Sequence, residues 1–94
     1  MYVLRTEHYA PDFDGWKAMF DGDPVDRAGK GVRHHRVFRA NKVPGLICVD
    51  LTFDTAEEAN ALLAAMSEVW KRVTGTLIDA PSARLFEVAE DVEY

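Results

Sequence analysis

The segment that follows Thr55 carries the strongest periodic pattern in the sequence. Thr55 and Glu58 have the spacing of a capping box, in which two side chains satisfy free backbone N–H groups at the start of a helix. Apolar residues then recur at the spacing of one helical face: Ala59, Leu62, Leu63, Met66, Trp70 and Val73. Gly75 ends the pattern, so the segment is predicted to be an amphipathic helix that must cover an apolar surface.

Four predicted strands supply that surface. Residues 2–9 alternate β-branched or aromatic side chains with polar ones, which is typical of a strand with one buried face. Further strands are predicted at 32–40, 46–53 and 83–91. A shorter helix, capped by Asp12, is predicted to carry Phe13, Trp16, Met19 and Phe20. The order βαββαβ belongs to the α+β class and predicts a ferredoxin-like antiparallel sheet, strand order 4-1-3-2, with both helices on one face.

Length, charge and cysteine content exclude several classes of protein. The 94 residues suffice for one domain, and we expect residues 1–94 to form it. Eleven Lys and Arg against sixteen Asp and Glu give a net charge of −5, which argues against nucleic acid as a partner. Cys48 is the only cysteine and cannot form an internal disulfide. The first residues contain no long apolar run, so we expect no signal peptide, no membrane segment and a cytoplasmic location.

The turn at residues 41–45 predicts how its two flanking strands pair. If Ala40 lies opposite Leu46, the same register places Arg36 opposite Asp50. The third strand then faces the helices with Ile47, Val49, Leu51 and Phe53. The opposite, open face of the sheet carries His34, Arg36, Phe38, Cys48, Asp50 and Thr52.

The first and last strands add to this open face. Arg5 and Glu7 would be costly beneath the helices, so they are expected on the open face together with Val3 and Tyr9. In the last strand the helix-facing residues are expected to be Phe86 and Val88, and the open-face residues Leu85, Glu87 and Ala89. Such a face is too apolar for a free surface and too charged for a dry core. A second copy of the chain would cover it around a two-fold axis, which predicts a homodimer through the sheet face; the alternative is a monomer with a solvated sheet.

The predicted catalytic residues lie on this open face. His34 is the best candidate for a general acid or base, because its ordinary pKa is about 6.5 and polar partners are expected beside it. Arg36 and Asp50 are expected to form a cross-strand ion pair, which either holds the register or takes part in catalysis. In the catalytic role, Arg36 or Arg5 binds an anionic substrate oxygen and Glu7 or Asp50 acts as base.

The expected ligand-binding residues are Arg5, Tyr9, Phe38 and Trp70. For Trp70, core packing is the structural alternative to a pocket wall. Neither a metal nor a cofactor is expected. Adjacent strand residues point to opposite faces, so His34 and His35 cannot chelate one ion. The sequence also contains no nucleophile elbow, phosphate-binding loop or zinc spacing.

Two segments and the order of elements resemble a known superfamily. Residues 12–17 follow the first strand as Asp-Phe-Asp-Gly-Trp-Lys, and residues 53–59 open the second helix as Phe-Asp-Thr-Ala-Glu-Glu-Ala. With the βαββαβ order, these segments resemble the dimeric α+β barrel superfamily. That superfamily includes antibiotic-biosynthesis monooxygenases, haem-degrading monooxygenases, stress-responsive barrel proteins and many small bacterial proteins, some called cyclases.

The resemblance implies a cavity between sheet and helices that binds a small hydrophobic, often aromatic, ligand. Trp70 lies roughly where haem-degrading members carry a Trp, but the strand-one Asn is absent and no His follows Trp70, which argues against haem degradation. The resemblance implies cofactor-independent oxygenation, cyclisation or isomerisation of an aromatic or polyketide-like compound. The alternative is a non-catalytic ligand-binding, interaction or stress-response barrel, because fold alone does not determine function.

Overall fold

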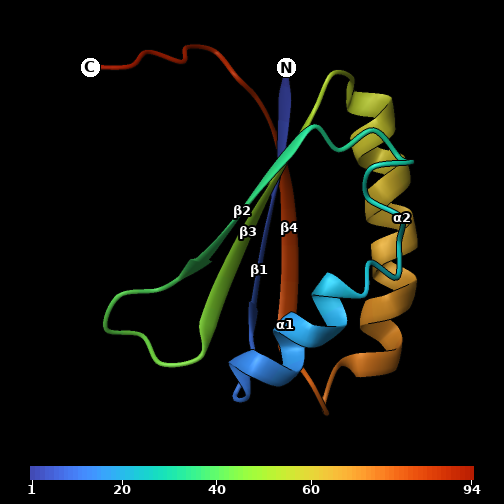
Figure 1. The fold of residues 1–94 in the computed structure, drawn as a ribbon, viewed down its shortest axis with the longest axis vertical. Coiled ribbons are helices and arrows are strands. Elements are labelled where there is room, and N and C mark those ends of the chain that lie inside the picture. The colour runs from blue at the N-terminus through green and yellow to red at the C-terminus, as the bar shows by residue number, and fades with distance from the viewer.

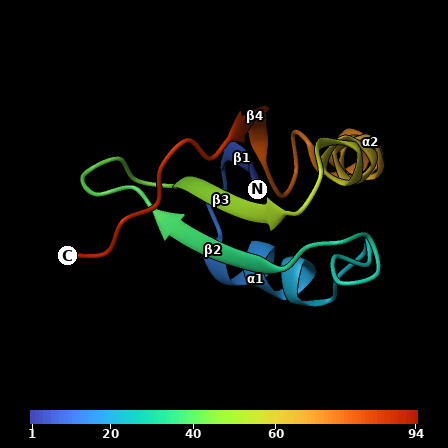
Figure 2. The ribbon, with the colours of Figure 1, turned by 90° about the horizontal axis from the view of Figure 1, so that it is seen from above.

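The computed structural model describes all 94 residues and contains four strands and two helices. In chain order these are β1 (Tyr2–Tyr9), α1 (Phe13–Asp21), β2 (His34–Arg39), β3 (Leu46–Phe53), α2 (Ala56–Val73) and β4 (Asp79–Glu87). The strands are antiparallel and lie in the order β2-β3-β1-β4, with both helices on one face of the sheet (Figures 1 and 2). The predicted ferredoxin-like fold and strand order are confirmed.

Side-chain caps begin both helices where the sequence predicts them. The Asp12 carboxylate accepts a hydrogen bond from the Gly15 N–H at 3.1 Å, and the Thr55 hydroxyl accepts one from the Glu58 N–H at 3.2 Å. The Glu58 carboxylate accepts the Thr55 hydroxyl proton at 3.1 Å instead of reaching back to the backbone. Each cap stabilises its helix by about 1 kcal/mol.

The core lies between the sheet and the helices. Burial along β3 alternates strictly, so that Ile47, Val49, Leu51 and Phe53 are buried and the residues between them are half-exposed. α2 covers them with Ala59, Leu62 and Val69, and α1 contributes Trp16. The predicted helix-facing side of β3 is therefore confirmed.

The prediction for the last strand is wrong. β4 begins four residues earlier than expected, and Leu4 of β1 pairs with Leu85, so Leu85 and Glu87 share the helix side of the sheet. Phe86 lies opposite Val3 on the open face and is 43% exposed. The register of β4 follows its pairing with β1, which includes a β-bulge beyond Glu7, and not the apolar alternation within β4 itself.

The chain between α1 and β2, residues 22–33, contains no helix or strand and runs along α2 (Figure 1). Gly31 in this segment is buried and has a φ of +98°, and a Cβ there would collide with the Glu58 carboxylate. Glycine is therefore required where this segment passes the start of α2. Neither helix combines the length and the apolar character needed to cross a lipid bilayer.

Candidate functional site

The open face of the sheet brings most of the predicted catalytic residues together, but in a different pairing. The predicted register is correct, because Arg36 pairs with Asp50 and His34 with Thr52. However, Asp50 also lies opposite Arg5 of β1, whose Nε and Nη2 each donate to one of its oxygens at 2.8 Å. This two-pronged geometry suits a guanidinium and a carboxylate, and it raises the pKa of Arg5.

The prediction of an Arg36–Asp50 ion pair is therefore wrong. The Arg36 guanidinium lies over the ring of Phe38 instead, 4.9 Å from its centre. On the open face, Arg5 lies over Phe86 at 5.8 Å, and a shallow hollow of about 300 Å³ runs over Arg5 and Glu7. Tyr9, at the end of β1, is 43% exposed. Cys48 also lies on this face, and burial raises the pKa of its thiol.

His34 is exposed at the edge of the sheet and does not share this hollow. It lines a separate polar hollow with His35 and Arg27. The structure therefore places Glu7, Arg5 and Asp50 close together and His34 apart from them. No group of three or more His, Cys, Asp or Glu side chains has the arrangement of a metal site.

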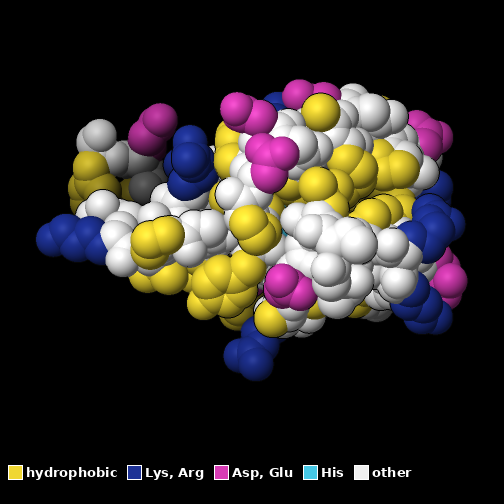
Figure 3. All heavy atoms as spheres, turned by 90° about the horizontal axis from the view of Figure 1, so that it is seen from below, with side chains coloured by type: hydrophobic (Ala, Val, Ile, Leu, Met, Phe, Trp, Pro, Cys, Tyr) yellow, Lys and Arg dark blue, Asp and Glu magenta, His cyan; other side chains and the backbone are white.

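A pocket lies on the other side of the sheet, beneath the two helices. Its walls are largely apolar and come from β1, β3, both helices and the segment after α1: Thr6, His8, Trp16, Met19, Phe20, Pro24, Val25, Arg27, Val49, Leu51, Met66, Val69 and Trp70. Its free volume is about 50 Å³, which is room for a few water molecules. Trp70 lines this pocket, which agrees with its predicted role as a pocket wall. Hydrophobic side chains also form a band across the end of the molecule seen from below (Figure 3).

His8 is the polar group that distinguishes this pocket from an ordinary core. The side chain is 3% exposed, and its Nδ1 atom has no hydrogen-bond partner. Buried polar atoms in native structures are nearly always paired, because an unpaired one costs about 1–3 kcal/mol. Burial lowers the pKa of His8 from its ordinary value of 6.5, so the imidazole is neutral at pH 7, with one nitrogen as donor and the other as acceptor.

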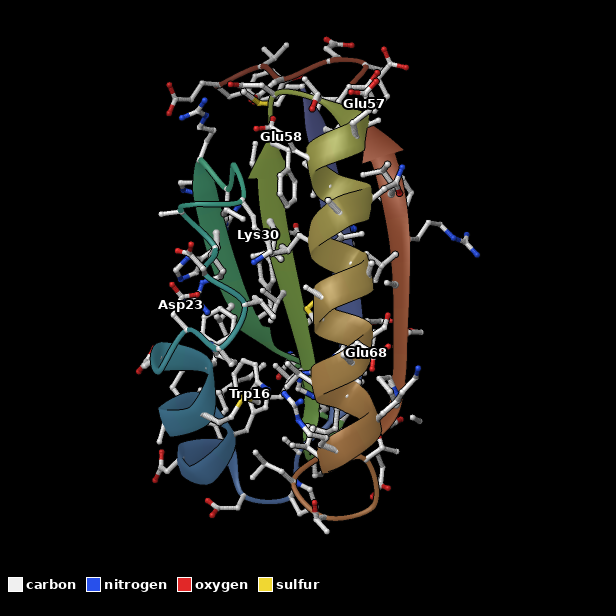
Figure 4. The ribbon with its side chains drawn as sticks, turned by 90° about the vertical axis from the view of Figure 1, so that its right-hand side faces the viewer. Trp16, Asp23, Lys30, Glu57, Glu58 and Glu68 are labelled. Atoms are coloured by element: carbon white, nitrogen blue, oxygen red, sulfur yellow. The ribbon has the colours of Figure 1, made fainter.

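A row of aromatic rings in contact leads from His8 to the surface. The His8 ring lies 5.0 Å from the Trp16 ring, and Trp16 lies 5.1 Å from Phe20 in a stacked arrangement. In Figure 4 the Trp16 side chain points from α1 into the space between the helices and the sheet. Phe20 in turn contacts His35 edge-on at 5.3 Å and lies 3.8 Å below the Arg27 guanidinium.

His8 was not among the functional residues predicted from the sequence. The signal was available in the alternation of β1, because Leu4, Thr6 and His8 share one face between exposed neighbours. A histidine at an inward position of a central strand is buried by the helices. Its missing partner, however, depends on the packing of α1 and is visible only in the structure.

Comparison with known proteins identifies the fold. No protein-family model matches the chain, and no curated protein matches it in sequence. The cofactor-independent oxygenase SnoaB of Streptomyces nogalater matches over 99% of this chain and 98% of its own, with a TM-score of 0.73 and 11% identity. The haem degrader MhuD of Mycobacterium tuberculosis matches over 99% and 100%, with a TM-score of 0.71 and 17% identity. A dimeric ferredoxin-like protein from an uncultured marine organism covers both chains fully, with a TM-score of 0.67 and 8% identity.

The chain has the fold of these ferredoxin-like proteins. The fold that the resemblance implied is thereby confirmed. MhuD was solved with two haems in its active site. A free volume of about 50 Å³ admits neither a porphyrin nor a smaller ring system unless the surrounding side chains move.

Proposed function

We propose that this protein binds a small aromatic compound in the pocket beneath the helices, and that His8 is its polar contact. The observation that carries this proposal is the unpartnered Nδ1 of a side chain that is 3% exposed. The apolar walls and the two tryptophans favour a flat ring system, since aromatic faces stack on one another. Met19 and Met66 are the flexible parts of the wall, and a ring enters when their side chains change rotamer.

The proposed reaction begins with transfer of a proton from the ligand to His8. The resulting carbanion then reacts with dissolved dioxygen in a cofactor-independent oxygenation, or rearranges in an isomerisation or cyclisation. A neutral imidazole is a suitable general base at pH 7, and burial keeps His8 neutral. The fold shared with the oxygenase SnoaB supports this reaction class. The competing proposal is a non-catalytic ligand-binding protein, which is favoured by the absence of any carboxylate from the pocket walls.

The open face of the sheet is proposed to form a homodimer interface. Its apolar members include Phe86 and Tyr9, each 43% exposed, and the Arg5–Asp50 pair lies among them. Two proteins with this fold are described as dimeric, which supports a dimer here. A second site is therefore predicted on the open face. Its expected catalytic residues are His34, Arg36, Asp50 and Glu7, and its expected ligand contacts are Arg5, Tyr9 and Phe38. They would form a site only inside the dimer.

Binding of a neutral aromatic probe tests the proposed pocket. Both tryptophans of the chain line it, so quenching of their fluorescence by naphthalene-2-methanol reports binding directly. We expect His8→Phe to weaken this binding by about tenfold, because a hydrogen bond in an apolar site is lost. His34→Phe, at an exposed position on the other face, is the matched control and should bind like the wild type. Equal binding by His8→Phe and the wild type would contradict the proposal.

A further inference from the structure

A polar hollow adjoins the apolar pocket, and the two share Arg27. The hollow has a volume of about 240 Å³ and lies between residues 22–33 and the start of β2. Arg27, Arg33, His34 and His35 line it, and Asp23 is its only carboxylate. Phe20 lies between the two spaces, since it lines the apolar pocket and contacts both Arg27 and His35.

The Arg27 guanidinium is held in place but keeps most of its donors free. Its plane lies 3.8 Å over Phe20, its Nη1 donates to the Phe20 carbonyl at 2.7 Å, and its side chain is only 14% exposed. The Asp23 carboxylate forms an ion pair with Nη1 at 3.6 Å and accepts the Arg27 backbone N–H at 2.9 Å. Nε and Nη2 have no acceptor. A fixed guanidinium whose Nε and Nη2 nitrogens hold three free N–H groups is suited to bind a carboxylate.

The neighbouring side chains add hydrogen-bond donors to this site. Burial and then the charge of Arg27 lower the pKa of His35, so at neutral pH its ring is neutral and offers one N–H donor. Arg33 lines the same hollow and is paired with Asp54 at 3.0 Å. The charge of Arg27 is therefore balanced by Asp23 and that of Arg33 by Asp54, and the donors left for an anion are Nε and Nη2 of Arg27 together with the two imidazoles.

We propose that the ligand of the apolar pocket carries a carboxylate, which Arg27 binds while the ring lies against Trp16. The ligand class is then a flat aromatic carboxylic acid with a second polar group. The carboxylate lies at the Arg27 end of the row of aromatic rings, and the second polar group bonds to His8. This inference rests on the proposed function, because the ring must occupy the pocket for the carboxylate to reach Arg27. It adds what the apolar walls do not specify, namely the charge of the ligand and its direction in the pocket.

The test compares two probes that share one ring system. Naphthalene-2-carboxylate and naphthalene-2-methanol differ in charge, and tryptophan quenching measures the affinity of each. We expect the wild type to bind the carboxylate about tenfold or more tightly than the alcohol, because hydrogen bonds between charged groups are the stronger ones. Arg27→Met should abolish this preference, which is the ratio of the two affinities measured within the same variant. Arg72→Met, which removes an exposed charge from the last turn of α2, should keep the preference.

The outcomes separate the two proposals. If the alcohol binds but the carboxylate is not preferred, or if Arg27→Met keeps the preference, the carboxylate inference is overturned and the proposed pocket stands. If neither probe binds, both are overturned. Circular dichroism checks folding, because Arg27 also holds the Phe20 carbonyl. Should Arg27→Met fail to fold, Arg27→Lys takes its place, and its loss of the paired N–H donors should reduce the preference at least about threefold. An unchanged preference in Arg27→Lys would then overturn the inference.

Discussion

The Nδ1 atom of His8 has no hydrogen-bond partner, although the imidazole packs 5.0 Å from the ring of Trp16. Such an arrangement destabilises the free protein and is therefore expected where a ligand supplies the missing bond. Stability and binding should respond in opposite directions when this group is removed, as is common at functional sites.

Replacement of His8 by phenylalanine tests this relationship. The change removes the unpaired nitrogen and keeps a ring against Trp16, so we expect the free energy of unfolding to rise by about 1 kcal/mol. Urea denaturation followed by circular dichroism measures it. His34→Phe, at an exposed position, should change stability by less than about 0.5 kcal/mol. A loss of stability in His8→Phe would show that Nδ1 is satisfied in solution.

Stability should also depend on pH through the same residue. Burial lowers the pKa of His8 in the folded state below the value near 6.5 expected when unfolded, so between the two pKa values only the unfolded chain binds the proton. The stability that neutral His8 supports is then fully present above pH 6.5 and is lost as the pH falls below it. The pKa of His35 is lowered as well and adds to this dependence. Urea midpoints from pH 5 to pH 8 should rise toward a plateau, with a smaller rise in His8→Phe.

The proposed dimer can be tested through the Arg5–Asp50 pair. In a single chain the pair lies at the surface, with the Arg5 side chain 50% exposed, and is worth less than about 1 kcal/mol. Inside an interface, Asp50→Asn would leave the Arg5 charge buried without its partner, so the dimer should dissociate at least about tenfold more readily. Sedimentation over a range of protein concentrations measures this. Arg36→Gln removes a charge from the same face without breaking an ion pair, and serves as the control. A wild type that sediments as a monomer at micromolar concentration would rule out the dimer.

At Gly31, the segment that carries Arg27 packs closely against Glu58 at the start of α2. Alanine there meets both an unfavourable φ of +98° and the Glu58 carboxylate, so Gly31→Ala should lower the free energy of unfolding by about 2 kcal/mol. Gly75→Ala is the matched control, because Gly75 has a φ of +90° but nothing within 4 Å of its added Cβ. The difference between the two variants in thermal denaturation isolates the collision with Glu58. Equal effects would mean that the collision is relieved by movement of the Glu58 side chain.

The open face shows where sequence reasoning reached its limit. The turn at 41–45 has few solutions, so the pairing of β2 with β3 could be predicted residue by residue. The partner of Asp50 could not, because Asp50 lies between Arg36 on one neighbouring strand and Arg5 on the other. The choice depends on which guanidinium reaches both carboxylate oxygens, and that depends on the side-chain geometry of three strands together.

The order of elements, both helix caps, the strand order and the inward face of β3 were determined by the sequence itself, because they depend on local periodicity, capping chemistry and the handedness of crossovers. Three features were decided only by the tertiary structure: the register of β4, the isolation of His8 beneath α1, and the position of Arg27 between two hollows. Each of these depends on contacts between segments that are distant in the chain. The alternation of polar and apolar residues shows that a side chain points inward, but only the packing of the helices determines what it meets there.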